Sequence, residues 1–179
     1  MLDIGLSRGF VEIGAGHGQW ARALTEAYDK RVPSGLKDKY FEFVLAYDNM
    51  KELPLSTQVY HQHTQQAHDF FYKKVKKMDN SVDTILRQWS CRGRILLLVY
   101  PPPGSMALET IQSYVSMGPE NDTVVYVGEG RGGCNADNEL FDYLELNQWT
   151  LECVMQVQSQ PGGKGFEKCY ILKRPKVLS

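Results

Sequence analysis

The sequence lacks the features that mark several large classes of protein. Its longest aliphatic run, residues 95–99, is far shorter than the roughly 18 to 20 residues that span a bilayer. The first residues show no basic region followed by an apolar stretch, so we expect no secretory signal. The four cysteines include no Cys-x-x-Cys pair, which argues against a zinc or redox dithiol motif. We therefore expect reduced thiols in the cytoplasm or another reducing compartment, and an organelle matrix fits equally.

Neither sign of charge is in excess. The 179 residues include 20 Lys+Arg and 21 Asp+Glu, for a formal net charge of -1. Domains held on nucleic acid by phosphate contacts usually carry a clear basic excess, so net charge does not support nucleic-acid binding. The lysines within residues 73–77 are a local exception, which we interpret as a solvated strand end, with RNA contact as the alternative.

Metal-binding patterns are also scarce. His61, His63 and His68 follow one another closely, but only Asp69 stands beside them as a further ligand. We interpret them as polar loop histidines and expect no metal. The segment 162–164 resembles a phosphate-binding loop only superficially, because the upstream spacing and the Ser/Thr after Lys164 are missing.

What is present fits one α/β domain. Hydrophobic residues make up 42% and charged residues 23%, as in ordinary globular domains. Apolar, β-branched runs alternate with helical patterns, which predicts a mostly parallel sheet. We expect strands at residues 9–13, 41–47, 70–75, 94–100, 123–127, 151–157 and 166–173. The short joint at 161–165 predicts that the last two form an antiparallel hairpin, with Cys153 and Cys169 as free core thiols.

The helices between these strands are predicted from their apolar stripes and caps. We expect them at residues 19–28, from Asn80 or Ser81 to about 89, at 106–115, and from a capping Asp137 to about 146. In the first, Trp20, Leu24 and Tyr28 form the stripe, and Ala23 and Ala27 widen it. In the second, we expect Val82, Ile85, Leu86 and Trp89 to face inward.

A glycine-rich turn links the first strand to the first helix. Glu12 is followed by Gly14, Gly16 and Gly18, with Ala15 between the first two glycines. Such a turn brings backbone N–H groups and the positive end of a helix to a nucleotide-like ligand. A dinucleotide fingerprint would need glycine at position 19, which is Gln. Asp48, which ends the second strand, can accept hydrogen bonds from ribose hydroxyls, although a solvated turn residue is the simpler alternative.

This E-x-G-x-G-x-G pattern, followed by Asp48, resembles the class I S-adenosylmethionine (SAM)-dependent methyltransferases. The resemblance covers nearly the whole chain. It implies a three-layer α/β fold with a mostly parallel seven-stranded sheet that ends in an antiparallel hairpin. The length and the lack of a linker lead us to expect a single domain over residues 1–179. Compared with the family, we expect this domain to lack the helices that usually precede the first strand, either by nature or because the chain is a fragment.

The resemblance also assigns roles to residues. It places SAM on the glycine turn, with Glu12 near the methionine ammonium and Asp48 at the ribose. Asn49 and Tyr100 are further expected cofactor-binding residues. Asp79 maps near the adenine amine, with Met78 against the ring; a helix-capping role for Asp79 is the alternative.

The end of the fourth strand is where the family places the reactive methyl group. Tyr100, Pro101 and Pro102 are similar there to the (Asp/Asn)-Pro-Pro-aromatic motif of nitrogen methyltransferases, but Tyr100 replaces the acid or amide and Pro103 the aromatic. A simple end of the sheet is the alternative. Glu129, in the Gly-rich segment after the fifth strand, is a candidate acid or base, or part of a flexible rim.

These observations lead to one preferred function and two rivals. The preferred one is methyl transfer from SAM by in-line displacement to an acceptor that the sequence does not identify. The first rival is a methyltransferase-fold binding or assembly module without turnover, associated with RNA or a ribonucleoprotein. The second, a nicotinamide-dependent oxidoreductase, is disfavoured by Gln19 and by Glu12 beside the loop.

Overall fold

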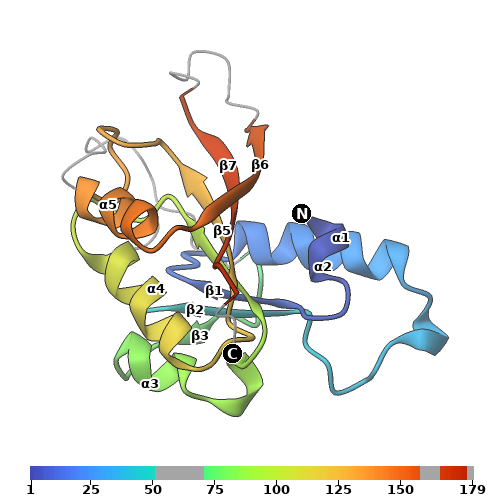
Figure 1. The fold of residues 1–179 in the computed structure, drawn as a ribbon. Helices are drawn as coiled ribbons and strands as arrows, with labels where there is room; N and C mark the ends of the chain where they lie inside the picture. The colour runs from blue at the N-terminus through green and yellow to red at the C-terminus, as the bar shows by residue number, and fades with distance from the viewer. Residues whose placement is uncertain (51–70, 158–165, 177–179) are drawn as a thin grey trace, which may run out of the picture.

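The computed structural model describes residues 1–50, 71–157 and 166–176. Its centre is one seven-stranded sheet with the order β3-β2-β1-β4-β5-β7-β6 (Figure 1). The strands are β1 (Phe10–Ile13), β2 (Val44–Asp48), β3 (Lys76–Lys77), β4 (Ile95–Val99), β5 (Thr123–Gly128), β6 (Thr150–Gln156) and β7 (Lys168–Lys173). Strands β1 to β5 are parallel to one another, whereas β7 runs antiparallel to both β5 and β6. The expected α/β fold with its C-terminal hairpin is confirmed.

Helices cover both faces of the sheet, which gives three layers. The helices are α1 (Leu2–Gly5), α2 (Gln19–Arg31), α3 (Val82–Leu86), α4 (Met106–Ser116) and α5 (Asn138–Leu146), with short 3-10 turns at Ser34–Leu36 and Trp89–Cys91. In Figure 1, α1 and α2 lie on one side of the sheet and α3, α4 and α5 on the other. Within the described residues, no helix has both the length and the apolar character that crossing a membrane requires.

The core explains why β4 is central. Leu96 and Leu98 face the α3–α5 layer, and Ile95 and Leu97 face the α1–α2 layer. All four side chains are fully buried. Side chains alternate between the two faces of a strand, so an uninterrupted aliphatic run fits a strand covered on both sides.

The third strand differs from its expected position. Residues 70–75 were expected to form it, but β3 is only Lys76–Lys77, paired with the end of β2; residue 70 lies outside the described part. The apolar side chains that suggested a strand pack against the glycine turn. Tyr72 and Val75 pack against Gly18, and the Tyr72 N–H donates to the His17 carbonyl at 3.1 Å. These residues therefore cover the glycine turn instead of extending the sheet.

Three side chains expected inside are on the surface. Trp89 is 81% exposed, because α3 ends at Leu86 and the 3-10 turn that follows points Trp89 outward, where the Arg92 guanidinium lies over its ring. Ala23 is exposed, and Ala21 takes its place on the buried stripe of α2. Cys153 is exposed on the edge strand β6, whereas Cys169 on β7 is buried.

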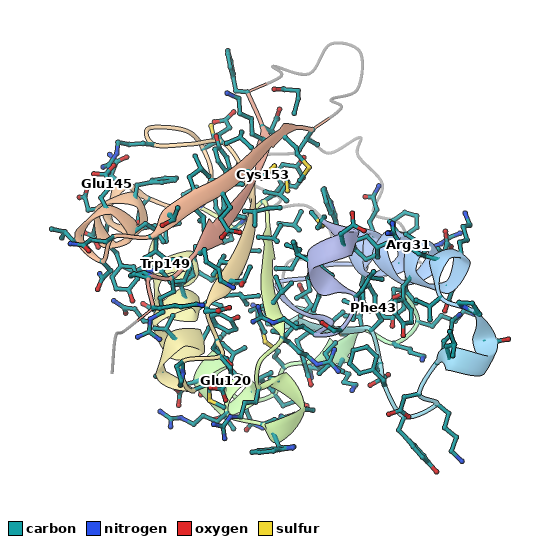
Figure 2. The ribbon with its side chains drawn as sticks, turned by 45° about the vertical axis from the view of Figure 1, so that its right-hand side comes forward. Arg31, Phe43, Glu120, Glu145, Trp149 and Cys153 are labelled. Atoms are coloured by element: carbon teal, nitrogen blue, oxygen red, sulfur yellow. The ribbon has the colours of Figure 1, made fainter. Side chains whose placement is uncertain are left out.

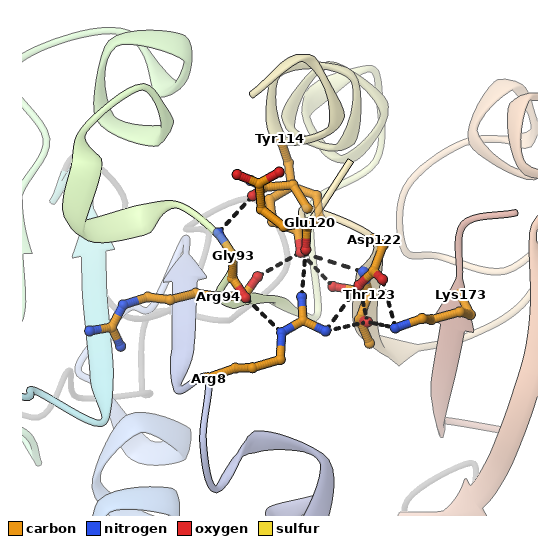
Figure 3. Close-up of polar contacts among 9 residues, drawn as sticks. Arg8, Gly93, Arg94, Tyr114, Glu120, Asp122, Thr123 and Lys173 are labelled. Atoms are coloured by element: carbon orange, nitrogen blue, oxygen red, sulfur yellow. Dashed lines mark hydrogen bonds and ion pairs between the residues drawn. The ribbon is translucent and has the colours of Figure 1, made fainter. Parts of the chain in front are cut away.

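A polar network closes the amino ends of β1, β4 and β5 (Figure 3). Arg8, in the turn after α1, donates from Nε to the Gly93 carbonyl at 2.6 Å and from Nη2 to the Glu120 carbonyl at 2.8 Å. Its Nη1 reaches the Asp122 carboxylate at 2.9 Å and the Thr123 hydroxyl at 3.0 Å. One side chain thus ties β1 to the turns before β4 and β5.

Candidate functional site

The glycine turn between β1 and α2 is held against the end of β2. Gly14 has φ +76°, Gly16 φ +53° and Gly18 φ +77°, a left-handed backbone that favours glycine. The N–H groups of Gly14 and Ala15 both donate to the Tyr47 carbonyl, at 2.9 and 3.0 Å. The turn is therefore a fixed part of the sheet edge.

The glycines of this turn have different surroundings. A Cβ added at Gly18 would lie 2.6 Å from Cβ of Tyr72 and 2.7 Å from Cγ2 of Val75. A Cβ added at Gly16 would meet nothing within 4 Å. Gly18 thus serves internal packing, whereas the backbone at Gly16 is open to a ligand.

Asp48 ends β2 directly beside this opening. Its side chain is largely buried, with Oδ2 accepting from the Gly16 N–H at 2.8 Å and Oδ1 from the Met50 N–H at 2.6 Å. A carboxylate has about four acceptor positions, so two such bonds leave room for hydroxyl donors. Asp48 therefore shapes the turn and can still bind a ligand; Asn49 follows it on the exposed side.

Glu12 is the most unusual residue of the site. It is 2% exposed, and burial, opposed by a hydrogen bond from the Ala21 backbone and reinforced by the charge of Asp48, raises its pKa to about 8. Ala21 lies in the first turn of α2, so Glu12 caps this helix in place of Gly18, which has no side chain. Oε2 of Glu12 is buried and has no hydrogen-bond partner among the described residues. Such an acceptor is completed by a donor that the described chain does not supply.

Tyr100 follows β4 with a strained backbone. Its φ is +47°, its N–H donates to the Val127 carbonyl at 2.8 Å, and its side chain is half exposed. Pro101 is buried and Pro102 is exposed. The Pro101 carbonyl accepts from Asn135 Nδ2 at 3.2 Å and from the Ala136 N–H at 3.3 Å. The proline segment thus supports the rim that follows β5, and Tyr100 is the member of it that offers a polar side chain.

Glu129 organises that rim. Its Oε2 accepts from the Cys134 N–H at 2.7 Å, and its own N–H donates to Asn135 Oδ1 at 3.0 Å. The Tyr126 hydroxyl donates to the Glu129 carbonyl at 2.9 Å. One carboxylate oxygen of Glu129, the candidate acid or base, therefore accepts a hydrogen bond within its own loop. The rim is held together by these hydrogen bonds.

Asp79 follows β3, which pairs with the end of β2 beside Asp48. Its exposed side chain pairs with Lys77, Nζ to Oδ1, at 3.1 Å. The cap of α3 is Ser81, whose hydroxyl accepts from the Thr84 N–H, so the capping alternative for Asp79 is wrong. Met78 next to it packs on the core, and its N–H donates to the Asp48 carbonyl at 2.8 Å.

The structure thus brings most of the expected residues to one edge of the sheet. The carboxyl ends of β1, β2, β4 and β5 carry them, as expected for parallel strands. They are Glu12, Gly14, Ala15, Gly16, Gly18, Asp48, Asn49, Tyr100, Pro101, Pro102 and Glu129. Within the described ranges, no group of three or more His, Cys, Asp or Glu side chains is arranged to hold a metal ion. His61, His63, His68 and segment 162–164 lie outside those ranges.

One residue of this edge was not predicted. Glu167 directly precedes β7, and Lys168 pairs with Gly128 at the end of β5. Oε2 of Glu167 is buried without a hydrogen-bond partner in the described residues. Because β7 is antiparallel, its first residues reach the edge where the parallel strands end. The predicted antiparallel hairpin was therefore the sequence signal that could have placed Glu167 at this edge.

An apolar cavity lies away from this edge. It has a volume of about 350 Å³ and opens under α5, lined by Tyr126, Leu140, Phe141, Trp149 and Tyr170 among others. Figure 2 shows Trp149 and Glu145 on this side of the molecule, opposite Arg31 and Phe43. The charged groups at the cavity, Arg131 and Glu145, pair with each other at 3.1 Å. The cavity therefore offers mainly apolar surface, and its two charged side chains are already paired.

Solved structures resemble the chain over almost its whole length. A ribosomal protein L11 methylase from Lactobacillus delbrueckii subsp. bulgaricus shares 16% identity over 97% of this chain and 76% of its own, with a TM-score of 0.49. Sp1610 from Streptococcus pneumoniae, a proposed tRNA methyltransferase, shares 7% over 99% and 71%, with a TM-score of 0.46. LepI in complex with SAM shares 14% over 97% and 46%, with a TM-score of 0.47.

Sequence comparisons give no match. No protein-family model matches the chain, and no curated protein matches it. The likeness to solved structures concerns the fold, so the chemistry of the site rests on its own residues.

Proposed function

We propose that the chain binds SAM at the carboxyl edge of its sheet and transfers the methyl group to an acceptor. The observation that carries the proposal is Glu12, a buried carboxyl with a free oxygen directly beside the glycine turn. A buried carboxyl is stabilised in its charged form by a cation. The ammonium of the methionine moiety is such a cation, whereas a dinucleotide pyrophosphate has no positive charge to offer Glu12.

The other residues fit the remaining parts of the cofactor. Asp48 keeps acceptor positions for ribose hydroxyls, and the open backbone at Gly16 lets a ligand approach closely. Tyr100 lies at the next strand end and borders the space beyond. A sulfonium supplies an already activated methyl group, so the protein needs mainly to position donor and acceptor.

Calorimetric titration with SAM and with its product S-adenosylhomocysteine tests the binding step. We expect both to bind with a Kd well below about 1 mM, and Asp48→Asn to weaken binding about tenfold or more, because a charge-assisted acceptor is lost. Glu152→Gln, an exposed acid on β6, is the matched control and should leave binding unchanged. Absence of heat at near-millimolar ligand would overturn the proposal, and enhanced NADH fluorescence on mixing would revive the oxidoreductase.

The second candidate is a binding module that keeps the fold without turnover. It is favoured by the rim, where the Pro101 carbonyl and one Glu129 oxygen are both hydrogen-bonded to the protein itself. Intact SAM binding together with no labelled methyl transfer would support this candidate. Labelled product from any acceptor would exclude it.

A further inference from the structure

Glu167 and Tyr100 flank the carboxyl end of β5 from its two sides. The Tyr100 N–H bonds to the Val127 carbonyl on the β4 side, and Lys168 pairs with Gly128 on the β7 side. Residues 124 to 128 of β5 are all buried, so the end of β5 between Tyr100 and Glu167 is well packed. A tyrosine hydroxyl and a carboxylate are thereby brought to the same edge as the glycine turn.

The two side chains interact. Partial burial and, to a smaller extent, the charge of Glu167 raise the pKa of the Tyr100 hydroxyl. Glu167 keeps one buried oxygen without a hydrogen-bond partner in the described chain. A buried acceptor without a partner is unfavourable, so we expect a donor from outside the described chain to complete it.

We propose that Glu167 binds the methyl acceptor and that this acceptor is an amine. The inference rests on the proposed methyl transfer. A carboxylate only accepts hydrogen bonds, and Tyr100 can accept one as well. The pair suits a neutral N–H donor whose attack on the methyl group develops a positive charge, whereas it repels a carboxylate or phenolate nucleophile. Glu12 cannot take this part, because it is buried beside the first turn of α2, on the far side of β4 from β7.

The chemistry balances with these groups alone. The lone pair of the neutral amine bonds to the methyl carbon, the carbon–sulfur bond breaks, and its electron pair stays on sulfur. The products are a thioether and a methylammonium. The methylammonium then loses one proton to the Glu167 carboxylate, which returns it to solvent. No oxidant, reductant or metal takes part.

The test compares two ligands that differ at the reacting position. Sinefungin carries an amino-bearing carbon where SAM has its methylated sulfur, and S-adenosylhomocysteine has neither group. We expect the wild type to bind sinefungin at least about tenfold more tightly by calorimetry, as one charge-assisted hydrogen bond implies. Glu167→Gln should reduce this preference to about twofold or less, without changing the affinity for S-adenosylhomocysteine. Glu152→Gln should retain it.

Each outcome bears on one proposal. If S-adenosylhomocysteine binds but Glu167→Gln keeps the preference, or the wild type shows none, the role of Glu167 is wrong and the proposed function stands. If neither ligand binds the wild type, the proposed function fails, and the inference fails with it. Should Glu167→Gln not fold, Glu167→Asp keeps the charge on a shorter side chain and should show a preference reduced to a few-fold. An unchanged preference in that variant counts against Glu167.

Discussion

At the amino ends of β1, β4 and β5, charged side chains are paired with one another and with the main chain, whereas at the carboxyl ends two carboxyls keep a buried oxygen without a partner in the described residues. Asn121 is a partial exception at the amino edge: its Nδ2 has no partner there, although its Oδ1 accepts from the Gly93 N–H at 2.8 Å. The unsatisfied groups of the carboxyl edge are acids, which are the more costly to leave unpaired.

Backbone strain follows the same division. Among the residues that the structure describes, four other than glycine have positive φ, and three of them, Met50, Tyr100 and Ala136, lie in the loops of the carboxyl edge. The fourth, Gln148, follows α5. A left-handed residue other than glycine costs roughly 1 to 2 kcal/mol. Strain and unpaired acids at one edge are retained where a ligand can use them, and the opposite edge stabilises the fold.

The pH dependence of stability should show the largest effect. The unfolded Glu12 carboxyl ionises near 4.5 and the folded one near 8. Between these values the folded state holds a proton that the unfolded state has released, so stability falls as pH rises. We expect a loss on the order of 4 kcal/mol from about pH 4.5 to 8 in urea unfolding. Glu12→Gln, which stays neutral, should lose most of this dependence.

Glu152→Gln serves as the control, because an exposed acid should leave the pH slope as in the wild type. If Glu12→Gln and wild type lost stability in parallel over this window, the burial of a protonated Glu12 would be refuted. The carboxyl edge would then no longer differ from the amino edge by a buried, protonated acid.

Removal of Arg8 should show the next largest effect. Arg8→Met leaves the carbonyls of Gly93 and Glu120 without their donor and removes one partner of Asp122, which Lys173 still holds at 2.8 Å. Because these groups are partly buried, we expect a loss of about 3 kcal/mol of unfolding free energy. S-adenosylhomocysteine affinity should be unchanged in the folded protein, since the network lies at the other edge.

Arg22→Met provides the comparison for a surface ion pair. Arg22 and Glu26 are one helical turn apart and both half exposed, so the change should cost less than about 0.5 kcal/mol. Equal losses for Arg8→Met and Arg22→Met would mean that the amino-edge network does not stabilise the fold.

The parts of the fold that the sequence predicts are those with strong local signals. Five aliphatic residues in β4 require burial on both faces, and Asp137 caps α5 by accepting from the Leu140 N–H at 3.1 Å. The short joint between β6 and β7 predicts their antiparallel pairing. The glycine turn with Asp48 is equally local, because spacing alone places it at strand ends.

The remaining features depend on contacts between distant segments. Arg8 and Asp122 are 114 positions apart, and no local pattern indicates that they pair. The sequence predicts that Tyr72 and Val75 lie in a strand, but they pack on Gly18 in a segment outside the sheet. The role proposed for Glu167 depends on Tyr100, which follows a strand two places away from β7 in the sheet.

The smallest expected difference is between alanine substitutions at two glycines of the same turn. Gly18→Ala combines left-handed strain with contacts of 2.6 and 2.7 Å to Tyr72 and Val75, so we expect a loss of about 2 kcal/mol or more. Gly16→Ala carries the strain alone and should cost about 1 kcal/mol. Its effect on S-adenosylhomocysteine affinity should be the larger of the two, because its Cβ enters the space left for a ligand. Calorimetry and urea unfolding on both variants measure this. If Gly16→Ala bound the ligand like the wild type, the opening at Gly16 would not be the binding site, and the two edges would differ only in backbone strain and in their unpaired acids.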